Sequence, residues 1–209
     1  RGINVNVTLI FGLDRYQEVM DAYIRGLQRL GKTNPSKVQE VASVASFFIS
    51  RVDSEVDKRL DAICTQDALD LRGKAAIAQA KIAYEMFEQT FSGEAWRSLA
   101  KLGAQVQRPL WASTSTKNPD YPDTMYVDEL IGPHSVNTLP DATMDAFSDH
   151  GSIAETITNN VEAARAVLHA LEGVGIDMTA IADQLEAEGV VSFQQSFNDL
   201  LAVLEAKSK

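Results

Sequence analysis

The sequence has little of what several classes of protein require. Cys64 is the only cysteine among 209 residues, so an intramolecular disulfide is excluded and an oxidising compartment is not indicated. No apolar run approaches the roughly 20 residues of a membrane span, and no signal peptide is recognisable, so we expect a cytoplasmic location. A glycine-rich phosphate loop is missing, and the three histidines share no ligand spacing on one predicted element. We therefore expect neither a metal nor a cofactor.

The charge of the chain is strongly acidic and unevenly placed. It carries 19 basic and 29 acidic side chains, a net charge of −10, and residues 152–209 hold three basic against nine acidic residues. Such a surface argues against nucleic acid or an anionic membrane as the main partner. The stretch from Lys101 to Lys117 is the exception, since it contains Arg108 and no acidic residue. A basic island in an acidic protein suits a small anion such as a phosphate ester.

Four short apolar segments alternate with helical patterns along the first three quarters of the chain. The predicted strands are Val5–Phe11, residues 41–52, Arg108–Thr114 and Ser135–Leu139. Between them, apolar residues recur at helical spacing over residues 13–30, 53–63 and 68–91. Strands that alternate with long helices predict βαβ units and a parallel sheet.

Four parallel strands do not make a closed structure. An open sheet of this kind leaves two unpaired edges and one apolar face, whereas a (β/α)₈ barrel takes about 250 residues for eight strands. We therefore expect an α/β fold in which residues 1–151 form about the last four strand-helix units of a (β/α)₈ TIM barrel. Residues 152–209 are predicted to add C-terminal helices that pack on the barrel. These helices are expected at about 153–172, 178–188 and 193–206, the last with Ser192 and Gln195 in capping-box spacing.

Four motifs, all at or near the C-terminal ends of predicted strands, are similar to the transaldolase family. They are residues 2–11 (GINVNVTLIF), the Ser-x-x-x-x-Arg element of residues 46–51, the pair Ala112-Ser113 followed by Lys117-Asn118, and residues 123–140. The last stretch resembles the longer transaldolases of bacteria. The motifs together span about residues 1–151, and their combination in this order is specific although each one alone is not.

The resemblance implies an activity and a partner. A transaldolase transfers a dihydroxyacetone unit from sedoheptulose 7-phosphate or fructose 6-phosphate to glyceraldehyde 3-phosphate or erythrose 4-phosphate, through a lysine Schiff base, in the pentose phosphate pathway. The matching motifs belong to the C-terminal half of the family, so the Schiff-base lysine is expected upstream of Arg1. The missing N-terminal barrel half is then an expected partner, besides the phosphorylated sugars.

The resemblance also assigns roles to five residues. Asn6 would hydrogen-bond the substrate hydroxyls, Thr8 would position the water that relays protons, and Ser46 would contact the bound three-carbon unit. Arg51 and Ser113 would bind the phosphate. The chemistry alone makes these residue types reasonable, because a carbinolamine must gain and lose protons and a phosphate needs cationic and hydroxyl donors.

Each of these residues also has a purely structural interpretation. Asn6 and Thr8 could satisfy local backbone groups of a strand, and Arg51 could form a solvent-facing ion pair with Asp53. The chain as a whole could be a truncated, non-catalytic barrel half that binds phosphosugar or only assembles. A related class I aldolase, which releases the three-carbon unit to water, is a further alternative.

Lys117 is open to two interpretations. It follows Ser113 at a distance two residues longer than the Arg found in many transaldolases, so it is only a candidate for phosphate binding. Taken without the family, Lys117 would be the candidate Schiff-base nucleophile. Such a lysine needs desolvation or a cationic neighbour to lower its pKa, whereas Lys117 lies among hydroxyl-bearing residues in a predicted loop. The sequence therefore disfavours the nucleophile.

Overall fold

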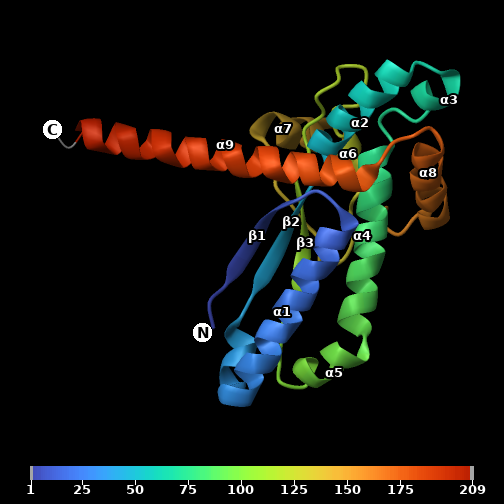
Figure 1. Cartoon of the computed structure of the whole chain (residues 1–209). Coiled ribbons are helices and arrows are strands. Elements are labelled where there is room, and N and C mark those ends of the chain that lie inside the picture. Colours follow the sequence, from blue (N-terminus) through green and yellow to red (C-terminus); the bar gives the residue numbers. More distant parts are fainter. Residues whose placement is uncertain (1, 208–209) are drawn as a thin grey trace.

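The computed structural model describes residues 2–207 and places the strands in one parallel sheet (Figure 1). The strand order is β1-β2-β3-β4, and every neighbouring pair is parallel. The bounds of the strands are Val5–Ile10 (β1), Ser43–Phe48 (β2), Gln107–Ala112 (β3) and Val136–Asn137 (β4). Sequential order in a parallel sheet is what consecutive βαβ units produce. The predicted α/β class with parallel strands is confirmed.

Helices connect the strands and cover one face of the sheet. The helical segments are α1 (Leu13–Thr33), η1 (Pro35–Glu40), α2 (Ser50–Ile63), α3 (Gln66–Leu69), α4 (Ala75–Ser92), α5 (Glu94–Ala100), α6 (Met125–Asp128), α7 (Asp141–His150), α8 (Val161–Gly173) and α9 (Met178–Lys207). Figure 1 shows α1 and α4, which contact each other, running along the sheet. Within residues 2–207 no helix combines the length and apolarity needed to cross a membrane.

The core forms between these helices and the sheet. Tyr16 and Met20, one turn apart on α1, are fully buried. The ring of Tyr16 meets Phe47 of β2 edge-on at 5.5 Å between centroids, and Phe47 meets Trp111 of β3 in the same way at 6.1 Å. Edge-on aromatic pairs of this kind contribute beyond their buried area. This chain of rings fixes α1 on the sheet and holds β2 and β3 in register.

Several boundaries differ from the sequence prediction, among them those of the third and fourth strands, which end at Ala112 and Asn137. The second strand ends at Phe48 instead of residue 52, because α2 begins at Ser50 and buries Val52 and Val56 at helical spacing. The apolar run continues from strand into helix without a polar break, so periodicity alone misplaced the boundary. The predicted helix over residues 68–91 is divided by a turn into α3 and α4.

The C-terminal helices also differ. The helix expected from residue 153 begins at Val161, and the two expected at 178–188 and 193–206 form the single helix α9. The capping-box prediction was wrong: Gln195 lies in mid-helix and donates to Asp199 Oδ1, 2.8 Å away. Gly189 lies within α9, at the point where this helix passes close to β1. A Cβ at this position would come within 2.9 Å of the Leu9 side chain. Glycine commonly follows the last residue of a helix. Here the close approach to Leu9 explains why a glycine lies inside one.

The outer edges of β1 and of the shorter strand β4 are both unpaired in the described residues. β1 pairs with β2 alone, and Ile3 and Val5 beside its other edge are 63% and 49% exposed. A groove of about 360 Å³ between β1 and α1 has Val5, Val7 and Val19 in its lining. An apolar groove along an unpaired parallel strand is what a further strand-helix unit would cover.

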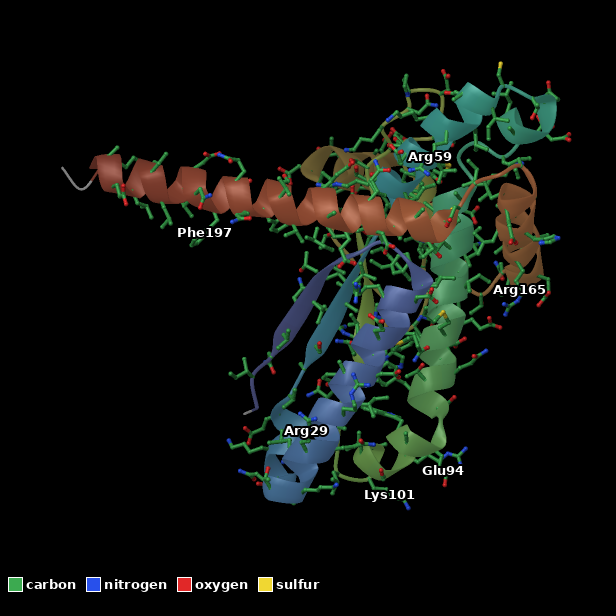
Figure 2. All side chains as sticks on the ribbon, in the orientation of Figure 1. Arg29, Arg59, Glu94, Lys101, Arg165 and Phe197 are labelled. Carbon is green, nitrogen blue, oxygen red and sulfur yellow. The ribbon has the colours of Figure 1, made fainter. Side chains whose placement is uncertain are left out.

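The helix α9 extends past this edge. Its first half is held by Arg59, which donates to Gln184 at 2.6 Å, and by Arg15, which donates to Glu186 at 2.9 Å. Beyond Gly189 every described residue is exposed, and Figure 1 shows this half projecting past β1. Phe197, 59% exposed, protrudes from it (Figure 2). The exposed apolar residues of this half are Val190, Val191, Phe193, Phe197, Leu200, Leu201, Val203 and Leu204.

We expect the chain expressed by itself to self-associate. The unpaired edge of β1 and the exposed half of α9 offer more apolar surface than a soluble monomer usually leaves uncovered. Size-exclusion chromatography with light scattering should report species larger than a monomer. Val5→Lys, or removal of residues 190–209, should each reduce association, whereas Ile63→Lys, a matched change at a lone exposed apolar residue, should not. A monodisperse wild-type monomer would contradict this expectation.

Candidate functional site

The polar side chains predicted for substrate binding meet on the sheet face opposite the helices. Asn6 of β1 and Ser46 of β2 lie on this face, and the Ser46 hydroxyl donates to Asn6 Oδ1 at 2.7 Å. Ser46 is buried, whereas Asn6 is exposed. An Asn that accepts from a fixed hydroxyl has its amide nitrogen free to donate to another group. The structure therefore brings these two candidates together and leaves one donor of the pair available.

A second contact joins the ends of β2 and β3. The backbone N–H of Ser50 donates to the Ser113 carbonyl at 2.9 Å, and the two hydroxyls lie 2.8 Å apart. The N–H of Ile49 donates to the Ala112 carbonyl at 2.9 Å, so the strand pairing continues into the first residue of α2. Ser113 has φ of 58°. This left-handed conformation costs free energy for a residue other than glycine, and such residues concentrate at functional sites.

Arg51 lies in the first turn of α2, directly after Ser50. Its guanidinium is 5.3 Å from the centre of the Phe48 ring, in a cation–π contact. The alternative ion pair with Asp53 was wrong, because Asp53 is buried and accepts hydrogen bonds from Ala76 and Tyr126. Arg51 makes no ion pair with any residue between 2 and 207. An exposed, unpaired guanidinium at a helix N-terminus is a favourable environment for an anion.

Thr8 stands near the C-terminal end of β1, two residues beyond Asn6. Its side chain is exposed, and its hydroxyl has no hydrogen-bond partner in the described part of the chain. The next residue, Leu9, has φ of 67°, and the pairing register with β2 shifts between Val7 and Ile10. An irregularity of this type changes the direction of a strand end. The structural alternative was that Thr8 satisfies local backbone groups. Its hydroxyl makes no such hydrogen bond within residues 2–207.

Lys117 lies apart from the other candidates. Its ammonium donates to the hydroxyl of Ser115 at 2.8 Å, and its side chain is exposed. It contacts neither Ser113 nor Arg51 among the described residues. The basic island of the sequence is also dispersed, since Lys101 lies beside α5 at the opposite end of the sheet (Figure 2), while Arg108 lies near the beginning of β3. These charges do not form one anion site.

Asp53 and its neighbours were not recognised as part of this region from the sequence. Asp53, 1% exposed, accepts from the backbone N–H of Ala76 and from the hydroxyl of Tyr126, both at 2.7 Å. Burial raises the pKa of Asp53 to about 6, although the two hydrogen bonds act in the opposite direction. Periodicity identifies Asp53 as a helix residue, but its tyrosine partner lies 73 residues later and has no local signal.

The groups of Ser50, Arg51 and Ser113 are typical of a class of β/α proteins that gather polar and cationic groups at the C-terminal ends of parallel strands, whereas Asn6 lies near the beginning of β1. Residues 1–204 match the family described as Transaldolase/Fructose-6-phosphate aldolase. Three bacterial transaldolases are similar to the chain: those of Parafrankia sp. (57% identical over 96% of the chain), Frankia alni (53% over 98%) and Thermobifida fusca (52% over 96%). The chain belongs to the transaldolase/fructose-6-phosphate aldolase family. It spans about half the length of these relatives, 54% to 55%.

The raised pKa of Asp53 generates a pH prediction. Because the pKa in the folded state exceeds the ordinary aspartate value of 3.8, the folded state retains a proton that the unfolded state releases. Stability from this group is fully present below pH 4 and is lost as the pH rises through about 6, by at most about 3 kcal/mol at roughly 1.4 kcal/mol per pKa unit. A carbon-13 NMR titration should show one aspartate carboxyl with a midpoint near pH 6.

Two variants assign this signal. Asp53→Asn should remove it, while the amide keeps the contacts with Ala76 and Tyr126. Asp57→Asn should retain it and lower its midpoint, because the negative charge of Asp57 contributes to the raised pKa of Asp53. If every aspartate titrates below pH 5, the buried environment of Asp53 is wrong.

Proposed function

We propose that this chain supplies the phosphosugar-binding part of a transaldolase. The observation that supports the proposal most is the pair of Asn6 and Ser46 on the open face of the sheet, with Arg51 and Ser113 directly after β2 and β3, in a chain that belongs to the family. The reaction would transfer a dihydroxyacetone unit from sedoheptulose 7-phosphate or fructose 6-phosphate to glyceraldehyde 3-phosphate or erythrose 4-phosphate. This is a step of the pentose phosphate pathway, and the compartment we propose is the cytoplasm.

The contacts suggest how the work is divided among the side chains. Asn6 holds a free amide donor toward the open face because its oxygen is occupied by Ser46, so it is suited to bind a sugar hydroxyl. Thr8 has a free hydroxyl on the same strand, and such a group can hold the water that carries protons between carbinolamine and imine. Arg51 provides the charge for the phosphate. Ser113 adds a hydroxyl whose direction is set by Ser50.

The Schiff-base lysine is proposed to come from a strand that pairs with the free edge of β1. Asn6 and Thr8 lie on this edge strand, so a lysine on the adjacent strand would be their neighbour. Lys81 is buried, but it is paired with Glu129 at 2.9 Å on the helix layer. Lys117 is exposed beside Ser115. Neither lysine lies on a strand of the sheet beside Asn6 and Thr8.

The division of the chain follows the same proposal. Residues 1–151 would form about half of a (β/α)₈ barrel and residues 152–209 its helical extension. The free half of α9 would then pack on strand-helix units added beyond β1, since it projects over that edge (Figure 1). A region of about 810 Å³ on the open face, with Asn6 and Arg108 in its lining, would be filled by the side chains of those strands.

Two alternative functions can be distinguished from a transaldolase by their reaction products. A barrel half without catalysis would bind phosphosugar but show no turnover when the further strands are supplied. A class I aldolase would release dihydroxyacetone to water instead of transferring it. The free, exposed hydroxyl of Thr8 favours catalysis over mere binding, because a relay water is needed only where protons move.

Two substitutions test the proposal through opposite kinetic effects. The completed protein is defined here as this chain co-expressed with the part of the Parafrankia transaldolase that the chain does not match. With fructose 6-phosphate and erythrose 4-phosphate, Arg51→Ala should raise KM roughly tenfold to a hundredfold, the effect of losing a charge-assisted hydrogen bond. Thr8→Val keeps the strand-compatible shape and should lower kcat by about a hundredfold.

Arg25→Ala is the control, since it removes an exposed arginine of α1 at a distance from the proposed site. It should change neither constant. Release of free dihydroxyacetone without transfer would support the aldolase, and complete inactivity of a folded, completed protein would support the non-catalytic half. An unchanged KM in Arg51→Ala would remove Arg51 from the phosphate site.

A further inference from the structure

The helix α2 presents a row of carboxylates on one face. Asp53, Asp57 and Asp61 follow one another at four-residue spacing and therefore lie on the same side of the helix. Each has a partner from outside the helix: the hydroxyl of Tyr126, the hydroxyl of Tyr121 and the guanidinium of Arg72, respectively. Tyr121 belongs to the loop that follows β3, and Tyr126 belongs to α6, the next helix along the chain. The row thus connects α2 with the segment that begins at Ser113.

Asp57 accepts two hydrogen bonds, one from Tyr121 and one from the turn at Gly73. The Tyr121 hydroxyl donates to Asp57 Oδ2 at 2.6 Å, and the backbone N–H of Gly73 donates to Asp57 Oδ1 at 2.9 Å. Gly73 has φ of +69°, and a Cβ there would lie 2.8 Å from the Tyr121 ring. Burial and the bond to Asp57 raise the pKa of Tyr121 to about 12, so the phenol remains a donor at neutral pH. Position 73 therefore requires a glycine for two reasons: the positive φ of the turn and the close packing of the Tyr121 ring.

Tyr121 in turn holds the loop that carries Lys117 and Asn118. Its backbone N–H donates to the Asn118 carbonyl at 3.2 Å, and the N–H of Asp120 donates to Asn118 Oδ1 at 2.9 Å. A cavity of about 270 Å³ lies between this loop and α2, with Lys117, Asn118, Asp57 and Tyr121 in its lining. The loop thus forms a turn between Asn118 and Tyr121. The side chain of Tyr121 is in turn bound to α2 through Asp57.

We infer that Asp57 and Tyr121 are positioning residues that set the distance between the Ser113–Tyr121 loop and the N-terminus of α2. The inference rests on the proposed function, because it takes Arg51 and Ser113 as the phosphate contacts. The loop is joined to α2 at Ser113 by Ser50 and again at Tyr121 by Asp57. Arg51 lies between these two attachments on the helix. The three groups form one unit, so release of Tyr121 shifts the loop relative to the guanidinium.

Tyr121→Phe in the completed protein tests this role through substrate choice. Loss of the hydroxyl should raise KM for fructose 6-phosphate by about tenfold, the scale of one hydrogen bond to a charged group, with kcat nearly unchanged. Unphosphorylated fructose should show no change in kcat/KM, because it has no phosphate to be misplaced. The matched control is Tyr23→Phe, whose hydroxyl donates to the Gln105 carbonyl at 2.8 Å near the beginning of β3. It should affect neither sugar.

Hydrogen exchange separates this inference from the proposed function. In the same protein, inorganic phosphate should slow amide exchange over residues 113–121, and Tyr121→Phe should accelerate exchange there and abolish the protection. If the completed protein transfers no dihydroxyacetone, the proposed function fails, and phosphate protection of this loop still decides the inference. Faster exchange with an unchanged KM for fructose 6-phosphate would make the contact merely structural. Equal losses for both sugars, or no phosphate protection in the wild type, would also overturn the inference.

Discussion

The structure depends on the pairing of β2 with β3, continued beyond the last residue of each strand. Six aligned residue pairs form this ladder, and the N–H groups of Ile49 and Ser50 extend it to the carbonyls of Ala112 and Ser113. Because α2 begins within this extension, its first turn is fixed on the end of β3. Arg51, Ser113 and the loop after Ser113 take their positions from these few hydrogen bonds.

The helix α2 has two electrostatically different sides. Its N-terminal turn offers backbone dipoles and the guanidinium of Arg51 to the outside, which favours an anion. Its carboxylates are turned to the other side, where tyrosine hydroxyls and backbone N–H groups neutralise their hydrogen-bonding demand. An acidic protein can therefore present a local site for phosphate without a large basic surface. The dispersed basic residues between Lys101 and Lys117 are not needed for this.

The sequence was sufficient to predict four parallel strands, and the resemblance singled out Asn6 and Ser46, which the structure joins by a hydrogen bond. β-Branched and apolar runs predict parallel strands, and equivalent positions on neighbouring strands share one face. It was insufficient where tertiary contacts overrode local patterns. Two helices were expected at 178–188 and 193–206, but α9 is continuous through Gly189, and Arg51 lay within the predicted strand 41–52 but belongs to α2. Ser113 has a positive φ, and the partners of Asp53 and Asp57 lie 16 to 73 residues away in the sequence, which no periodicity records.

The central claim is that this chain binds the phosphosugar while another strand provides the nucleophile. Borohydride reduction of the completed protein with fructose 6-phosphate, followed by peptide mapping, tests this claim most directly, because reduction converts the imine into a stable adduct on the lysine that formed it. The account predicts an adduct on the complementing part and none on residues 1–209. An adduct on Lys117 would contradict it and make this chain a Schiff-base enzyme in its own right.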